Sequence, residues 1–328
     1  MFTLSNHSEI KMIGYEISDT TRWGRLPVYR RDVSLADVPN FLPMFSRQPF
    51  ANDNYENDFL DVISREPFGS DEGRYPIATV SKKYTLVQHR GVTDELLDAI
   101  HAAGLNTENM SARVTMSEYG ARMSLDIMLP DFTYDPGDGY PLSLRLRLRN
   151  SVDGMSSFGV SISWFRLVCK NGMTRLTHED AYSAVHIGDI EPNELRNFLL
   201  TRIPANIKQL ELFRSWIDSP VDQVKLESWA EAEVRSRWGH TAAARVLNIC
   251  RTGYDGRVEI KRGEGEGPVA ALQVSSDIKV PGSGAPVANV YHAYQALTWI
   301  SERRRRIEDQ DGWGAQALDM TRQLLLCA

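Results

Sequence analysis

Residues 142–149 read LSLRLRLR, and this alternation constrains the fold more than any other stretch of the chain. Successive side chains of a β-strand point to opposite sides, so the stretch predicts a strand with one apolar and one basic face. Leucines occupy the apolar face. Arg145, Arg147 and Arg149 recur on the other face at intervals of roughly 6.6–6.8 Å. The chain must therefore build a sheet that buries one side of this strand.

The segments around this strand share its period of two. Residues 112–116, 122–129 and 158–169 alternate in the same way, and turns rich in Gly and Asp separate the segments. Sequential strands with short connections predict an antiparallel meander. Asp126 lies on the polar face of the second segment and is an obvious partner for one of the arginines.

Outside the meander the pattern changes along the chain. Residues 75–80 predict another strand, and Thr93 is expected to cap the helix that follows. Polar stretches within 52–58 are expected to form loop. After residue 175 the periodicity is helical, apart from a long Gly- and Pro-rich loop at 261–288.

These patterns predict an α+β fold, with a central antiparallel β-meander, flanking helices and a mainly helical C-terminal portion. We expect two parts: residues 1–178, an α+β domain with the central sheet, and residues 179–328, a helical portion that packs on it or serves in oligomerisation.

Composition limits the class of protein. The formal net charge is −6, and no apolar run is long enough to span a bilayer. The N-terminal residues lack the basic and apolar regions of a secretory signal. Three scattered cysteines without a CxxC motif suit a reducing compartment. We therefore expect a cytoplasmic protein without membrane contact.

A negative chain is a poor indiscriminate nucleic-acid binder, so any contact with DNA has to come from a local basic patch. Guanidinium groups match phosphate oxygens in geometry and keep their charge, and a base could stack on the ring of Tyr84. The candidate nucleic-acid-binding residues are Arg145, Arg147, Arg149, Arg113, Arg122, Lys82, Lys83, Tyr84 and Lys170. The sequence leaves open whether the arginine row is free or paired with carboxylates on neighbouring strands.

No motif predicts catalysis, a metal ion or a cofactor. His178, Glu179 and Asp180 are suitable ligand types, but their spacing matches no known metal motif. A nucleophile elbow, a Walker A loop and a dinucleotide fingerprint are all missing. The basic run 303–306 is interpreted as a helix-end turn that pairs with its acidic neighbours.

Four phrases of the chain resemble one family, the phage/plasmid-like domain of unknown function 932. They are RYPIATVSKKYTLVQHRGVTDELLDAI (74–100), LVCKNGM (167–173), SRWGHTAAARVLNICRTGYDG (236–256) and VANVYHAYQALTWISE (287–302). The resemblance implies a chain carried on bacterial plasmids, prophages and integrated elements, which favours a role in handling DNA. It implies no catalytic residue. The order of a meander followed by a helix is also similar to the core of single-strand annealing proteins.

Together these observations predict a DNA-binding protein of a mobile element that binds or anneals single-stranded DNA through a basic sheet face. The sequence leaves open a homo-oligomer. An alternative is a non-catalytic protein-interaction factor that counters host defence or modulates replication, for which the acidic net charge is natural. A metal-dependent enzyme using His178 is the third interpretation.

Overall fold

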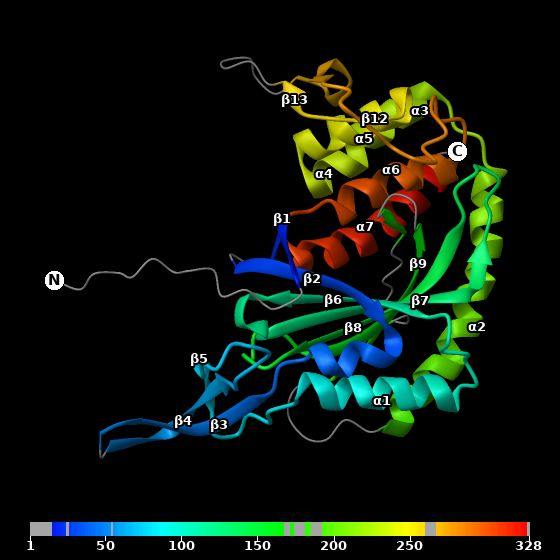
Figure 1. Cartoon of the computed structure of the whole chain (residues 1–328). Coiled ribbons are helices and arrows are strands. Elements are labelled where there is room, and N and C mark those ends of the chain that lie inside the picture. The colour runs from blue at the N-terminus through cyan, green and yellow to red at the C-terminus, as the bar shows by residue number, and fades with distance from the viewer. Residues whose placement is uncertain are drawn as a thin grey trace. The chain divides into compact units, whose positions relative to one another are not determined.

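The computed structural model describes residues 15–23, 26–53, 55–166, 171–173, 181–184, 192–259 and 267–326. These residues form a mixed α+β fold, with antiparallel sheets in the N-terminal half and mainly helices in the C-terminal portion (Figure 1). The fold class predicted from the sequence is confirmed. Among the described helices, none is long and apolar enough to cross a membrane.

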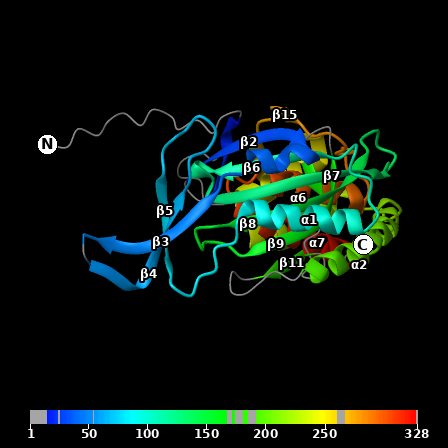
Figure 2. The same cartoon turned by 60° about the horizontal axis from the view of Figure 1, so that its bottom comes forward.

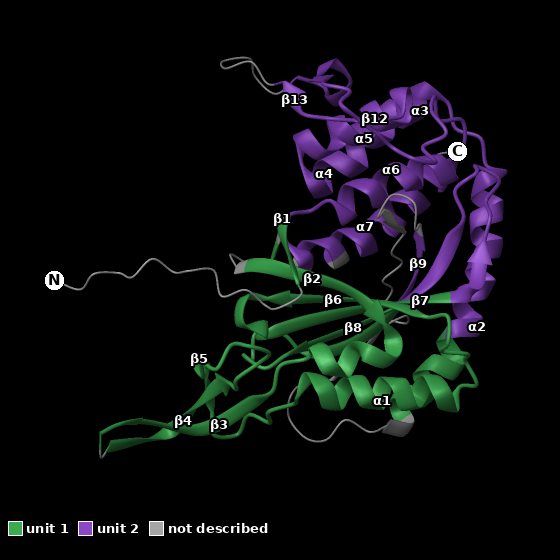
Figure 3. Ribbon diagram, viewed as in Figure 1, with its two compact units in different colours: residues 1–129, 146–161, 181–202 green, residues 130–145, 162–180, 203–328 purple. Residues whose placement is uncertain are grey.

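The chain folds into two compact units, each built from several separate segments (Figure 3). The first unit contains residues 1–129, 146–161 and 181–202, and the second contains the remaining segments, 130–145, 162–180 and 203–328. This grouping differs from the single boundary after residue 178 that the sequence suggested, because the chain passes between the units within strands of the sheet.

Within the described chain, eight strands form the main sheet, in the order β1-β2-β6-β7-β8-β9-β10, and β11 pairs with β9. Their bounds are β1 (Glu16–Trp23), β2 (Leu26–Ser34), β6 (Ser111–Ser117), β7 (Arg122–Tyr134), β8 (Leu142–Ser151), β9 (Phe158–Arg166), β10 (Asn171–Met173) and β11 (Ala181–Ala184). Strands β6 to β9 follow one another in sequence and in space, so the predicted meander is present.

The alternation of β8 buries its leucines as expected, and Leu142, Leu144, Leu146 and Leu148 are all inaccessible to solvent. In the first unit, helix α1 (His89–Ala102) lies along one face of the sheet (Figures 1 and 2). Helix α1 begins before Thr93, which was expected to be its cap. The Thr93 hydroxyl is buried and donates to the carbonyl of His89, one turn back.

A separate three-stranded sheet extends from the first unit (Figure 2). It has the order β3-β4-β5, with β3 (Phe45–Asn52) and β4 (Tyr55–Arg65) joined in a hairpin and β5 (Tyr75–Ser81) beside β4. The prediction of loop within 52–58 is wrong, because Asn52 pairs with Tyr55 across a tight turn. Asp53 adopts a left-handed φ of 52° in that turn, a conformation that Asp tolerates better than most residues.

Helices and short strands dominate the second unit. They are α3 (Gln223–Trp229), a π-helical turn (Ala230–Val234), α4 (Arg235–Trp238), α5 (His240–Thr252), β12 (Tyr254–Asp255), β13 (Val258–Glu259), β14 (Gln273–Val274), β15 (Ile278–Lys279), α6 (Val290–Glu302) and α7 (Ile307–Leu326). Helix α2 (Pro192–Ile217) continues through Pro204 and runs from the first unit into the second. Nearly every residue of α6 is buried, and this helix packs against α5 and α7. The region 261–288, expected as loop, contains β14 and β15, which pair with β13 and β12.

Candidate functional site

On the basic face of β8, Arg145 and Arg147 both donate to oxygen acceptors. Arg147 is buried and donates from Nε to Asp126 Oδ1 at 2.5 Å and from a terminal nitrogen to Oδ2 at 3.3 Å. Asp126 lies on β7, the neighbouring strand, as the sequence suggested. The guanidinium of Arg147 is therefore already occupied by a carboxylate.

Arg145 is even less accessible, at 2% exposure. Two of its nitrogens donate to the hydroxyl of Ser163 at 3.2 and 3.1 Å, and its guanidinium carbon lies 4.8 Å from the ring centroid of Phe165. A terminal nitrogen lies 3.6 Å from a carboxylate oxygen of Glu302, whose side chain is also buried. Arg145 thus belongs to the interior of the second unit, where Glu302 neutralises it.

Arg149 is half-buried, and two of its nitrogens are shielded from solvent. The row on β8 does not present three accessible cations. Of the two arrangements left open by the sequence, pairing with carboxylates is the one found for Arg145 and Arg147. Nucleic-acid binding by these residues stays a prediction.

Four of the charged residues in the first unit form a row across the strands, which we call the charge ladder: Asp32, Arg113, Asp126 and Arg147, together with the adjacent Arg30. Arg113 on β6 lies opposite Asp32 on β2 and opposite Asp126 on β7. Its guanidinium donates to both oxygens of Asp32, at 2.6 and 2.8 Å. The sign of the charge therefore alternates from β2 to β8.

Arg30 adds a third guanidinium group to the ladder. It lies two residues before Asp32 on the same strand and so on the same face. Burial, followed by the charges of Arg113 and Arg147, lowers the pKa of Arg30, against the opposing effect of Asp126 and Asp32. The hydrogen bonds to Asp32 instead raise the pKa of Arg113. The register places Glu16 of β1 opposite Arg30, so this part of the sheet carries three guanidinium groups and three carboxylates.

Arg122 and Tyr84 also serve the interior of the first unit. Arg122 donates to Asp153 at 2.6 Å, and both side chains are largely buried. The Tyr84 hydroxyl donates to the carbonyl of Ser151 at 3.2 Å. Burial, reinforced by the charge of Asp153, raises the pKa of Tyr84 to about 12. The ring of Tyr84 is half-buried and is not presented as an open stacking platform.

The three predicted lysines are not brought together with the arginines. Lys82 forms an ion pair with Glu56 at 2.8 Å, at the surface of the three-stranded sheet, and Lys83 is exposed in the same turn. Lys170 lies outside the described residues. The predicted site residues thus divide among the charge ladder, the interiors of the two units and the turn after β5.

The tip of the β3–β4 hairpin, residues 50–60, is a surface that the sequence interpretation missed. Tyr55 and Phe59 are 84% and 78% exposed, and Phe50 is exposed as well. Acidic residues Asp53, Glu56 and Asp58 lie between these aromatic residues along the hairpin and are exposed as well. Large aromatic side chains are expected to be mostly buried, so three exposed rings in one short hairpin are unusual.

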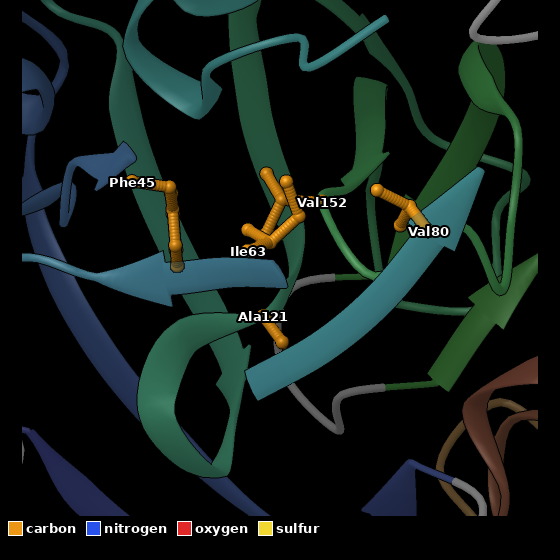
Figure 4. Close-up of a cluster of buried hydrophobic side chains, with 5 residues drawn as sticks. All are labelled: Phe45, Ile63, Val80, Ala121 and Val152. Carbon is orange, nitrogen blue, oxygen red and sulfur yellow. The ribbon is translucent and has the colours of Figure 1, made fainter. Parts of the chain in front are cut away.

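The base of the hairpin, by contrast, is firmly attached to the first unit. Phe45, Ile63 and Val80 come from the three strands and pack with Ala121 and Val152 in a small buried cluster (Figure 4). The side-chain amide of Gln88 makes two hydrogen bonds with the backbone of Phe45. Its oxygen accepts from the Phe45 amide at 3.1 Å, and its nitrogen donates to the Phe45 carbonyl at 2.8 Å. The hairpin is thus held at one end and exposed at the other.

Arg47 adds a polar clamp on the outer side of this base. Its guanidinium donates to Asp61 at 2.5 Å and to the carbonyls of Tyr84 and Lys82 at 2.6 and 2.7 Å. These contacts join β3 and β4 to the turn after β5. A signal for the hairpin was present in the sequence, since Asp53-Asn54 is flanked by aromatic residues at 50 and 55.

The metal-ligand candidates His178, Glu179 and Asp180 lie outside the described residues. Within the part of the chain that the structure describes, no group of three His, Cys, Asp or Glu side chains is placed to hold a metal ion.

Comparison with known proteins gives one match. The family model described as Domain of unknown function (DUF932) matches residues 76–323. No curated protein and no solved structure matches the chain. The matched range begins in β5, so it includes most of the meander and the helical portion but not the tip of the β3–β4 hairpin.

Proposed function

Because the chain belongs to the DUF932 family, whose description assigns no activity, we propose a function from the molecule itself: a non-catalytic factor that binds another protein through the hairpin tip. The observation that carries the proposal is the exposure of Tyr55, Phe59 and Phe50 on a hairpin whose base is buried. This is the protein-interaction alternative considered from the sequence, now assigned to particular residues.

Physical chemistry favours such a tip as a recognition element. An aromatic side chain removes 150–250 Å² from water when it is buried. Tyr and Trp are enriched among the few interface residues that carry most of the binding energy. A fixed base lowers the entropic cost of binding, because the backbone is already ordered. Phe45 and Arg47 provide that fixed base.

We propose that the partner is a protein of host defence or of the replication machinery, the two classes considered in the sequence analysis. Both fit a chain with a net charge of −6, which has no general attraction for nucleic acid. The hairpin tip lies outside the range matched by the family, so we expect its partner to be specific to this chain and its near relatives.

Affinity capture from host extract tests the proposal, with the full chain as bait. The test variant is Tyr55→Ser combined with Phe59→Ser, and the control is Val224→Ser, an exposed apolar residue of α3. We expect one protein to be captured by the wild type and by the control. Its affinity for the purified tip variant should fall at least about a hundredfold, since two interface aromatics each contribute roughly 2 kcal/mol.

Two outcomes contradict the proposal. Capture of the same proteins by all three baits assigns the binding elsewhere on the chain. Absence of any captured protein with the wild type removes the basis for a protein-binding role. Circular dichroism of the tip variant separates loss of binding from loss of fold.

Single-stranded DNA binding is the second candidate, and the grouping of Arg30, Arg113 and Arg147 in the charge ladder is the observation that favours it. Fluorescence anisotropy with a labelled oligothymidylate over a salt series tests it. If the ladder binds phosphates, Arg30→Gln weakens binding and flattens the salt dependence, while Arg74→Gln, a surface arginine of the same unit, does neither. An unchanged titration with Arg30→Gln excludes the ladder.

A further inference from the structure

The second unit contains a hollow of about 540 Å³ that no part of the proposed function uses. Its wall is formed by the turn between β7 and β8, the segment from Lys279 to Ala285, and His292 near the start of α6. All of these residues belong to the second unit. The volume lies within the range of small-molecule sites, about 300–1,000 Å³, and exceeds what a single inorganic anion fills.

Two polar groups in the wall have no partner within the described chain. Ser283 is only 8% exposed, and its hydroxyl makes no hydrogen bond to the described residues. The ammonium of Lys279 is exposed and forms no ion pair there. The Ser283 hydroxyl keeps some contact with solvent, so a molecule that enters the hollow can supply the hydrogen bond that it does not make within the described chain.

The segment that carries Ser283 is shaped by its glycines. Gly282 and Gly284 have φ values of 66° and 59°, which favour glycine. A Cβ on Gly284 would lie only 2.3 Å from Nδ1 of His292, so the backbone rests directly on the imidazole ring. This close approach fixes the position of Ser283 between two glycines. The wall is therefore a defined structure.

The charges of the wall indicate the class of ligand. Lys279 supplies a cation, and the Ser283 hydroxyl and the His292 imidazole supply hydrogen-bonding groups. Asp138 also lines the hollow, and one of its oxygens accepts from the amide of Tyr140 at 3.0 Å. A ligand that carries both an anionic group and hydrogen-bond donors complements these groups. Tyr140 adds an aromatic residue to the lining.

We propose that this hollow binds a small phosphomonoester that carries hydroxyl or amino donors, with its phosphate on Lys279 and Ser283 and its donors on Asp138. The proposal is independent of the hairpin tip, which lies in the other unit. The residues of the hollow lie within the range matched by the family, unlike the hairpin tip.

Isothermal titration of the full chain with three probes tests the proposal: adenosine 5′-monophosphate, adenosine and inorganic phosphate. The nucleotide should bind at least about tenfold more tightly than either other probe, because only it carries both an anion for Lys279 and donors for Asp138. Lys279→Gln should weaken nucleotide binding about tenfold through loss of a charge-assisted hydrogen bond. Lys208→Gln, an exposed lysine of α2 outside the wall, should leave it unchanged.

Asp138→Asn provides a second measurement that does not depend on Lys279. It should lower the preference for the nucleotide over inorganic phosphate, since it replaces one acceptor oxygen by a donor and removes the repulsion of the anion together. The proposal is overturned if the nucleotide produces no saturable heat, or if Lys279→Gln binds it as the wild type does. Equal binding of adenosine and its monophosphate overturns the assignment of an anionic ligand.

Discussion

Asp255 shows how a single carboxylate organises the second unit. It is 1% exposed and accepts hydrogen bonds from two nitrogens of Arg245, at 2.7 and 2.6 Å. It also accepts from the indole of Trp299 and the amide of Gly256, both at 2.8 Å. These contacts join α5 to α6 through β12. Removing the charge leaves the guanidinium of Arg245 without its counter-ion, and one of the two oxygens no longer accepts from its donors.

We therefore expect Asp255→Asn to destabilise the protein by about 2–3 kcal/mol. Removing one partner of a buried ion pair costs more stability than the pair contributes, because the other charge stays buried without a counter-ion. Arg245 is partly exposed, which reduces this loss of stability. Urea denaturation at neutral pH measures the change in the free energy of unfolding. Asp218→Asn, at an exposed position after α2, is the control and should stay within about 0.5 kcal/mol of the wild type.

The same carboxylate makes stability depend on pH. Burial by itself raises the pKa of Asp255, but the hydrogen bonds and charge of Arg245, with the Trp299 and Gly256 donors, outweigh it and hold the pKa below its ordinary value. The contribution is complete above about pH 5 and is lost as the pH falls through about 3.9 and on to the folded-state pKa. The wild type should lose more stability than Asp255→Asn over this acid range. Parallel curves for the two proteins would contradict this.

At the scale of elements, the three-stranded sheet shows how an exposed hairpin is held in place. The buried cluster of Phe45, Ile63 and Val80 holds one side of its base, and the Arg47 clamp holds the other. The strands beyond Pro49 have no such support, since residues 50–53 and 55–56 are exposed. The hairpin should therefore open locally, from the tip towards the base.

Arg47→Ala should accelerate amide hydrogen exchange in β3, β4 and β5 about tenfold, because it removes charge-assisted bonds worth on the order of 1.5 kcal/mol or more. Exchange in α5 and α6 should not change. Arg74→Ala removes a surface ion pair with Glu66 near the same sheet and serves as the control. Exchange rates in β3 that match the wild type would show that the apolar cluster alone holds the base.

At the scale of the whole molecule, the two units interleave along the chain. Arg145 and Trp164, which come before residue 178, belong to the second unit, together with Asn206 and Glu302. The indole of Trp164 donates to the carbonyl of Asn206 at 3.1 Å, and Arg145 faces Glu302. A cut between the predicted domains would separate both pairs.

We expect a fragment of residues 179–328 to lack a cooperative thermal transition, because Glu302 and the main chain of Asn206 lose partners that they have in the full chain. Differential scanning calorimetry of the fragment and of the full chain makes the comparison. Co-expression with residues 1–178 is the control and should restore the transition. A cooperative transition in the isolated fragment would show that the helical portion folds alone.

The sequence by itself determined the local periodicity of this protein. The alternation in 142–149 predicts β8 and the burial of its leucines, because the geometry of a strand sends neighbouring side chains to opposite faces. The period of two in the flanking segments predicts the meander for the same reason. Local sequence also identified Asp126 as a partner for the arginines, which Arg147 confirms.

Only the tertiary structure decided what lies against each face. Alternation is the same for a solvated arginine and for one buried against a carboxylate, and Glu302, the partner of Arg145, lies far away in the sequence. The hairpin tip depends likewise on distant contacts, since Val152 and Gln88 hold its base. Periodicity reports the direction of a side chain, whereas burial and charge pairing depend on elements that the fold brings together from elsewhere in the chain.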